Sequence, residues 1–174
     1  GSGDSSFVSM NPYQKSSGQA KLTWKQGNFK VALTGIGSTE SFNGGRGIQE
    51  MTFMPEWRRN EQKDAFTTFL KLTHTLSATT FYELGITRSK TEFDSALFDD
   101  PFDARYQDNT YIDFTDGINT SNFRVGGTDN GRFSRSTETY LVKWDLTSQF
   151  SKRNMVKAGI EFRKHDLNFL DEFT

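Results

Sequence analysis

The chain has 174 residues, 33% of them hydrophobic, 25% charged and 14% aromatic, with a mean hydropathy of −0.69. Seventeen Phe against three Pro argue against disorder, because disordered chains are poor in aromatic residues. The absence of Cys excludes disulfides, thiol catalysis and Cys-ligated zinc. Residues 1–90 carry eleven basic and seven acidic residues, whereas residues 91–174 carry ten and fifteen. This balance lacks the sustained basic surface of a nucleic-acid-binding protein, so we expect no nucleic-acid partner.

We expect neither a membrane-spanning helix nor a signal peptide in this sequence. No apolar run of eighteen residues occurs, which excludes a membrane-spanning helix but leaves a membrane β-barrel open. The opening residues GSGDSS have neither the charged nor the apolar region of a signal peptide.

The first predicted hairpin covers about residues 19–39, after a polar lead-in over residues 1–18 that we expect to be irregular. Ala20, Leu22 and Trp24 alternate with polar residues, and the alternation resumes after the turn signal Gly27-Asn28. Gly35 and Gly37 near its far end predict a bulge or a close backbone approach. Residues 40–63 break the alternation and predict a long loop, with a short strand extension over Met51–Met54.

The second predicted hairpin covers about residues 64–90. Its first arm places Phe66, Leu70, Leu72 and Leu76 on one face, and His74 is a polar exception on that face. The turn SATT at 77–80 follows, and Tyr82, Leu84 and Ile86 continue the apolar face on the second arm. Residues 91–133 then form a second long connection with nine acidic residues and three Arg. A connection of this length is abnormal in a compact soluble domain.

The third predicted hairpin covers about residues 134–169. Tyr140, Val142, Trp144, Leu146 and Phe150 lie mostly on one face, and Val156, Ala158, Ile160 and Phe162 continue it after the turn SKRN at 151–154. Each arm has about twelve residues, compared with about 5–6 in a typical soluble strand and about 9–11 in a transmembrane strand.

The pattern therefore predicts an all-β fold: an antiparallel up-and-down meander of about six long strands, a partial transmembrane β-barrel wall in a single segment over residues 1–174. Short turns alternating with long loops are typical of outer-membrane barrels. Aromatic or sulfur-containing side chains flank each short turn, as in an interfacial girdle or in cross-strand pairs of a soluble hairpin. These are Trp24, Phe29, Phe81, Tyr82, Phe150 and Met155.

Several stretches resemble the TonB-dependent outer-membrane receptors, most closely the Bacteroidetes-type group with a carboxypeptidase-regulatory-like domain. They are KLTWKQGNFKVALTG, TFLKLTHTLSATTFYELGITRSKTEF, FDDPFDARYQ and KWDLTSQFSKRNMVKAGIEFRKHDLNF. The resemblance implies a large closed barrel with a plug domain, located in the bacterial outer membrane, that imports a bulky scarce ligand. It also implies lipid, the rest of the barrel, the plug and a TonB-type energising protein as partners, the last acting through the missing plug region. The sequence contains no plug or TonB box, and six strands are too few to close a barrel. We therefore expect an internal barrel segment, and the ligand remains unknown.

Candidate catalytic and metal-binding residues are few. Ser151, His165 and Asp166 lack the motif of a serine hydrolase, and His74 is the only other imidazole. Five acidic loop residues could gather oxygens around Ca²⁺, but their spacing matches no EF-hand and Pro101 interrupts them. They are Asp94, Asp99, Asp100, Asp103 and Asp108. We expect no enzyme activity, no catalytic, cofactor-binding or metal-binding residues and no cofactor.

Two further groups of residues have open interpretations. Trp57, Arg58 and Arg59 could dock an anionic ligand or an outer-leaflet phosphate, or could form a plain barrel rim. A mixed set of charges is expected on the inward face, where it either lines a wet lumen or is the solvated side of a sheet. This set is Lys71, Glu83, Lys143, Asp145, Lys157, Glu161 and Arg163. Asn119-Thr120-Ser121 matches a glycosylation acceptor, which is uninformative on a bacterial surface.

Two functions compete with the receptor. One is a soluble or surface-exposed β-sheet module that binds a partner through the 91–133 loop, and the other is a structural outer-membrane barrel component without transport. A soluble sandwich must cover Val142, Trp144, Ile160 and Phe162 with a second sheet about 10 Å away. A barrel wall leaves these side chains facing lipid.

Overall fold

A computed structural model describes residues 9, 11–43, 51–108, 110–113 and 120–173. It is an all-β structure in which six strands form one antiparallel sheet in the order β1-β2-β3-β4-β7-β8. The strands are β1 (Tyr13–Gln26), β2 (Phe29–Asn43), β3 (Asn60–Ser77), β4 (Thr80–Ala96), β7 (Gly131–Ser151) and β8 (Asn154–Phe173). Neighbours in the sheet follow one another along the chain except that β5 (Thr110–Asp113) and β6 (Thr120–Gly126) form a separate pair between β4 and β7. The predicted all-β meander is confirmed.

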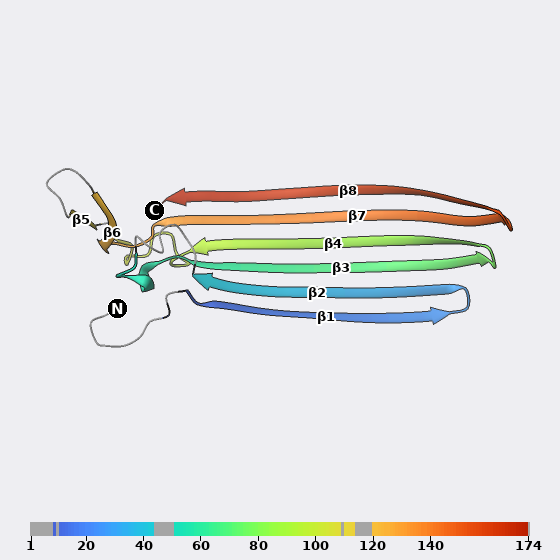
Figure 1. Cartoon of the computed structure of the whole chain (residues 1–174), viewed down its shortest axis with the longest axis horizontal. Helices are drawn as coiled ribbons and strands as arrows, with labels where there is room; N and C mark the ends of the chain where they lie inside the picture. Colours follow the sequence, from blue (N-terminus) through green and yellow to red (C-terminus); the bar gives the residue numbers. More distant parts are fainter. Residues whose placement is uncertain (1–8, 10, 44–50, 109, 114–119, 174) are drawn as a thin grey trace.

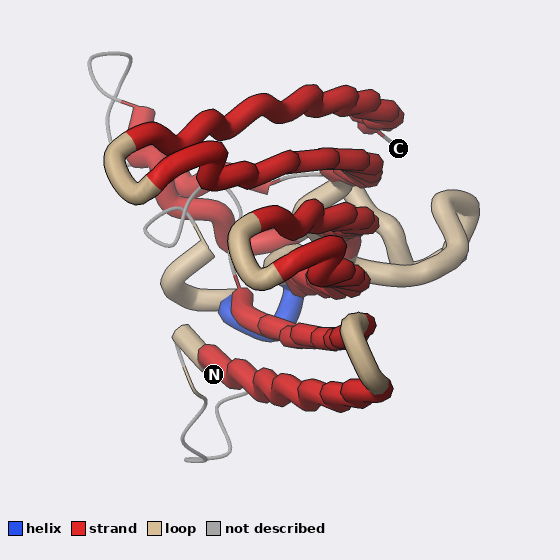
Figure 2. Tube along the Cα trace, turned by 90° about the vertical axis from the view of Figure 1, so that its right-hand side faces the viewer, coloured by secondary structure: helices blue, strands red, loops and turns tan. Residues whose placement is uncertain are grey.

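All three short turns lie at one end of the sheet, and the start of β1, the end of β8 and the described parts of the long connections lie at the other (Figure 1). Gly27 opens the first turn with φ 56°, a left-handed conformation that glycine adopts without steric cost. The turns are also linked to the neighbouring hairpins, because the Thr75 amide donates to the Asn28 carbonyl at 2.9 Å and the Gln149 amide donates to that of Thr79 at 2.9 Å. The sheet is a single open layer when viewed along its strands (Figure 2).

The strands are longer than the sequence pattern predicts. β1 begins at Tyr13 inside the expected irregular lead-in, and β2 and β3 occupy both ends of the expected 40–63 loop. The expected strand over Met51–Met54 is wrong, since this segment is a turn followed by the 3₁₀ helix η1 (Pro55–Trp57). The expected 91–133 loop contains the end of β4, all of β5 and β6 and the start of β7.

Of the two alternatives expected at Gly35 and Gly37, a bulge or a close backbone approach, neither is found: β2 pairs with both neighbours without a register shift there, and no backbone atom comes closer than 4.0 Å to an added Cβ. A side chain at Gly35 would meet nothing within 4 Å, and one at Gly37 would sit 3.7 Å from the Phe66 ring. Both positions therefore belong to regular extended strand.

Uninterrupted register sorts the side chains onto two faces. We call the apolar face the one that carries Leu22, Trp24, Val142, Trp144 and Ile160, and the polar face the one that carries Lys71, Glu83 and Lys143. In the described six-stranded sheet, the strand pairing shifts register only beside two short turns, between Thr75 and Ser77 and between Gln149 and Ser151. Because side chains alternate along each strand, the two faces remain distinct over the whole sheet.

The sheet has no core of its own on either face. Among the described residues, the one fully buried hydrophobic side chain is Met51, which lies in the connection between β2 and β3. No helix in the described part of the chain is long and apolar enough to cross a membrane.

Gly159 of β8 offers a test of the register. A Cβ at this position would lie 2.5 Å from an Asp145 carboxylate oxygen and 3.0 Å from the Trp144 carbonyl oxygen. Gly159→Ala should therefore lower the free energy of unfolding by about 1–3 kcal/mol, the usual cost of overpacking. The measurement is guanidinium unfolding in dodecyl maltoside micelles, followed by tryptophan fluorescence.

Gly35→Ala is the matched control for this substitution. It places the same methyl group on a strand where nothing lies within 4 Å. It should leave stability unchanged or raise it by about 0.5–1 kcal/mol through the loss of glycine flexibility. Equal stability of the two variants would contradict the observed pairing of β7 with β8.

Candidate functional site

Two complete rows of apolar side chains cross the apolar face from β1 to β8. Each row contains one residue from each of the six strands, paired directly with its neighbours. The first row is Leu22, Leu33, Leu70, Ile86, Val142 and Phe162, and the second is Trp24, Val31, Leu72, Leu84, Trp144 and Ile160. Leu22 is 72% exposed, Ile160 71% and Phe162 68%. This surface is larger and more regular than scattered exposed hydrophobic residues on a soluble monomer.

The next row toward the short turns has three adjacent rings at its centre, Phe29, His74 and Tyr82, and His74 is the exception in the sequence pattern. The His74 ring stacks on Phe29 with centroids 3.9 Å apart and meets Tyr82 edge-on at 5.2 Å. Its Nδ1 also lies 3.2 Å from the Tyr82 hydroxyl. His74 therefore fits the apolar face as one ring of an aromatic cluster.

Beyond the two rows, in the direction of the long loops, the apolar face becomes charged. Arg88 pairs with Glu138 at 2.6 Å, and the Tyr140 hydroxyl donates to the same carboxylate at 2.7 Å. Lys164 pairs with Asp166 at 2.9 Å. The apolar surface therefore ends, on the side of the long loops, at about the level of Tyr140.

The polar face carries all seven members of the expected inward-facing set. Lys71 pairs with Glu83 at 2.8 Å. Lys143 pairs with Asp145 at 3.2 Å and Arg163 with Glu161 at 2.8 Å. Lys157 lines a shallow hollow with Glu83 and Asp145. All three pairs are partly exposed, so solvent screens them and they contribute little to stability.

A second hollow on the polar face is more apolar. The Phe69 ring lies over Gly85, where an added Cβ would sit 3.3 Å from the ring, and Leu141 completes the lining with the two ion pairs around it. Glycine at this position lets an aromatic ring cover the neighbouring strand, a known device for stabilising sheets.

The long connections form a compact assembly at the far end of the sheet, which we call the loop cluster: residues 51–59, 96–108 and 127–132. Arg59 pairs with Asp129 at 3.0 Å, with side chains only 15% and 12% exposed. The Asp129 amide donates to the Trp57 carbonyl at 3.0 Å, and the Trp57 ring meets Phe98 at 6.4 Å. These contacts join three segments that are far apart in sequence.

Arg58 and Arg59 are both held by contacts within the loop cluster. Arg58 is 1% exposed and its Nε donates to the Pro55 carbonyl at 3.3 Å, while Arg59 is held by Asp129. Arg58 is buried and Arg59 is mostly buried against Asp129, so the structure favours the rim interpretation of Trp57, Arg58 and Arg59 over anion docking. The role of Arg59 gave no signal in the sequence, because its partner Asp129 is seventy residues away.

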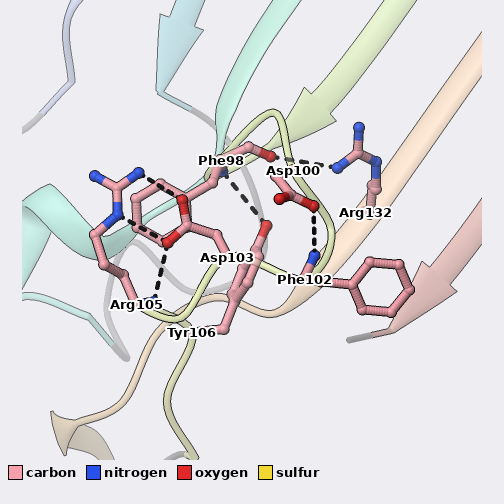
Figure 3. Close-up of polar contacts among 7 residues, drawn as sticks. All are labelled: Phe98, Asp100, Phe102, Asp103, Arg105, Tyr106 and Arg132. Carbon is pink, nitrogen blue, oxygen red and sulfur yellow. Dashed lines mark hydrogen bonds and ion pairs between the residues drawn. The ribbon is translucent and has the colours of Figure 1, made fainter.

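The five acidic residues considered as Ca²⁺ ligands form no metal-binding group in the part of the chain that the structure describes. Among the described residues, no three acidic or imidazole side chains are arranged to hold a metal ion. Asp103 is held by Arg105 through two bonds of 2.9 and 2.6 Å, and Asp100 accepts a bond of 2.9 Å from the Phe102 amide (Figure 3). These two carboxylates shape the turn that carries Phe102, which is 88% exposed and points away from the other labelled side chains (Figure 3).

The Ser151, His165 and Asp166 arrangement is also separated. Ser151 lies at the short turn, and His165 is about 36 Å further along β8 at the usual strand rise. His165 Nδ1 lies 2.8 Å from the Thr139 hydroxyl, and Asp166 pairs with Lys164. Asn119 lies outside the described residues.

No family model and no curated protein matches the chain.

Asp103 provides a pH test of the loop cluster. Hydrogen bonds from the Arg105 side chain and backbone lower the pKa of its carboxyl from 3.8 to about 2. Since the folded pKa is below the unfolded value, the stabilisation is present above pH 3.8 and is lost as pH falls toward 2. Carboxyl-carbon NMR should give a midpoint near 2, and Arg105→Gln should raise it toward the ordinary Asp value. Equal midpoints in the two proteins would show that the Asp103–Arg105 contact does not form.

Proposed function

We propose that this chain forms part of the wall of an outer-membrane β-barrel of the TonB-dependent receptor type. In this role the apolar face contacts lipid, the polar face lines the lumen and the loop cluster lies on the extracellular side. The barrel would take up a bulky scarce ligand, with a plug domain and a TonB-type energising protein as partners. The supporting observation is the pair of six-residue apolar rows that nothing in the described structure covers.

The dimensions of the apolar face fit a bilayer. On β7 it runs from Tyr140 to Phe150, about 33 Å along the strand. At a strand tilt of about 40°, this corresponds to a height of about 25 Å, the usual height of the apolar band on an outer-membrane barrel. The remainder of β7, from Gly131 to Thr139, would project beyond the membrane on the side of the long loops.

The two ends of the sheet fit the same orientation. Outer-membrane barrels have short turns on the periplasmic side and longer loops outside. Trp24, Phe29, Tyr82 and Phe150 lie on the apolar face near the short turns, where aromatic side chains favour the membrane–water interface. Phe81, also beside a short turn, lies on the polar face.

The outer edges of β1 and β8 favour the proposal that the sheet is a segment of a larger barrel wall. Among the described residues, β1 pairs with β2 alone and β8 with β7 alone. Their free backbone groups would have no hydrogen-bond partner in lipid, so a membrane wall needs further strands at both edges. The sandwich alternative would need a second sheet over Val142, Trp144, Ile160 and Phe162, and the described residues place none there.

Adjacent residues of β1 provide a matched test of the proposal. Leu22 lies on the apolar face and Thr23 on the polar face, and both are exposed. If the apolar face contacts lipid, Leu22→Arg should cost about 2–4 kcal/mol of insertion free energy, and Thr23→Arg should cost little. The measurement is the fraction of chain that co-floats with phosphatidylcholine vesicles and resists protease.

Two outcomes would contradict the proposal. In the first, both arginine variants co-float as well as the unchanged chain. In the second, the unchanged chain is a monodisperse monomer in buffer without detergent or lipid, which would indicate that the apolar face is covered in solution.

A further inference from the structure

The apolar side of every strand but β3 changes between the two ends of the sheet. Near the short turns most large apolar residues lie on the apolar face, with Phe69, Phe81 and Leu141 as exceptions, whereas near the loop cluster five aromatic residues lie on the polar face. They are Tyr13 of β1, Phe42 of β2, Phe93 of β4, Phe133 of β7 and Phe169 of β8. Phe93 contacts Phe133 with ring centroids 5.9 Å apart, and Tyr13 contacts Phe42 at 6.3 Å. The change requires no register shift. On β4, β7 and β8 most large residues are at even-numbered positions near the short turns and at odd-numbered positions near the loop cluster.

One row of the polar face at this level alternates basic and aromatic side chains over its last four positions. Direct pairing across the sheet gives the order Lys15, Glu40, Lys63, Phe93, Arg135 and Phe169, which we call the basic–aromatic row. Side chains directly opposite each other have Cβ atoms about 5 Å apart. Arg135 therefore lies between the rings of Phe93 and Phe169, and Phe169 is 71% exposed.

The charges of the basic–aromatic row do not balance. Glu40 is its only carboxylate, and Lys15 forms an ion pair with it. Within the described residues, Lys63 and Arg135 form no ion pair. The nearest acidic position beside Arg135 on this face, Asp171, is one row further and is not paired with it. Arg135 is thus an exposed cation without an ion pair, placed between Phe93, which packs on Phe133, and the exposed ring of Phe169. Lys63 is exposed beside Glu40, whose carboxylate it shares with Lys15.

We infer that the basic–aromatic row is a binding site for a ligand that carries an anionic group on an aromatic or flat apolar body. Arg135 donates hydrogen bonds to the phosphate, sulfonate or carboxylate, since its planar guanidinium matches such oxygens. Lys63 adds a second positive charge about 10 Å away, two strand spacings along the row. Phe93 and Phe169 stack on the ligand body.

The row lies away from the surface that would contact lipid. It is on the opposite face, and on β1 it is seven residues from Leu22, about 23 Å along the strand. A lipid headgroup at the upper limit of the apolar face would meet Arg88, Tyr140 and Lys164 instead. The ligand is therefore a soluble molecule, and the placement of the row on the lumen side rests on the proposed function.

The test uses the full chain in the non-ionic detergent dodecyl maltoside, with 1-naphthyl phosphate as the probe and equilibrium dialysis as the measurement. The chain should bind the probe above the level of empty micelles and at least about tenfold more tightly than inorganic phosphate or the cation 1-naphthylmethylammonium. Arg135→Gln should weaken binding about tenfold, because a charged hydrogen bond is lost. Phe169→Ala should weaken it several-fold through the loss of stacking. Both side chains are exposed, so both variants should keep the fold.

Arg163→Gln is the matched control, since it removes a guanidinium from the same face of β8 outside the row. It should change binding less than twofold. The inference fails if the unchanged chain binds no probe, if the cation binds as well as the anion, or if Arg163→Gln weakens binding as much as Arg135→Gln. A chain that inserts into vesicles but fails these binding tests would refute the row alone, and a chain that binds but does not insert would refute the membrane wall alone.

Discussion

The uninterrupted hydrogen-bonded register of the six long strands is the constraint on which the rest of the structure depends. A slip of one residue in any strand would move its whole set of apolar side chains to the other face. Instead, six independent arms agree, and two complete apolar rows form across β1 to β8. The same register builds the basic–aromatic row at the other end of the sheet. Both surfaces are therefore products of backbone pairing and need no tertiary core.

A sheet without a core needs stabilisation from outside itself. Burial of one large apolar side chain contributes about 1.5–3 kcal/mol, and the two apolar rows leave most of this contribution unused in water. Lipid on the apolar face and further strands at the edges of β1 and β8 would supply what the described chain lacks. The loop cluster is different, because Met51, Arg58 and the Arg59–Asp129 pair are buried within it. That part of the chain has a small interior of its own.

Much of the sheet could be predicted from the sequence, because the alternation that identifies each strand is a pattern of neighbouring residues. Alternation of apolar and polar residues over 19–39, 64–90 and 134–169 identifies the hairpins, and Gly27-Asn28 identifies one turn. The strand ends near the loop cluster could not be predicted in this way, because their large residues lie on the opposite face of the sheet. Phe42, Phe93, Phe133 and Phe169 break the alternation set by the apolar rows, so the pattern ends while the strand continues.

The candidate surfaces were predicted less completely. The inward-facing charges of Lys71, Glu83 and Lys143 follow from alternation, and the structure places them on one face. Arg59 and Asp129 could not be connected, since seventy residues separate them and only the folded connections bring them together. The order of the basic–aromatic row depends on the register between strands, which a single sequence does not contain.

The central claim is that the apolar face contacts lipid, and the three Trp residues test it most directly. Trp24 and Trp144 lie on the apolar rows, whereas Trp57 lies in the loop cluster. Each can be kept as the only tryptophan, with the other two changed to Phe, in vesicles whose acyl chains carry bromine. Bromine quenches tryptophan fluorescence only at short range, so Trp24 and Trp144 should be strongly quenched and Trp57 should not. Equal quenching of the three residues, or none of Trp24 and Trp144, would contradict the account.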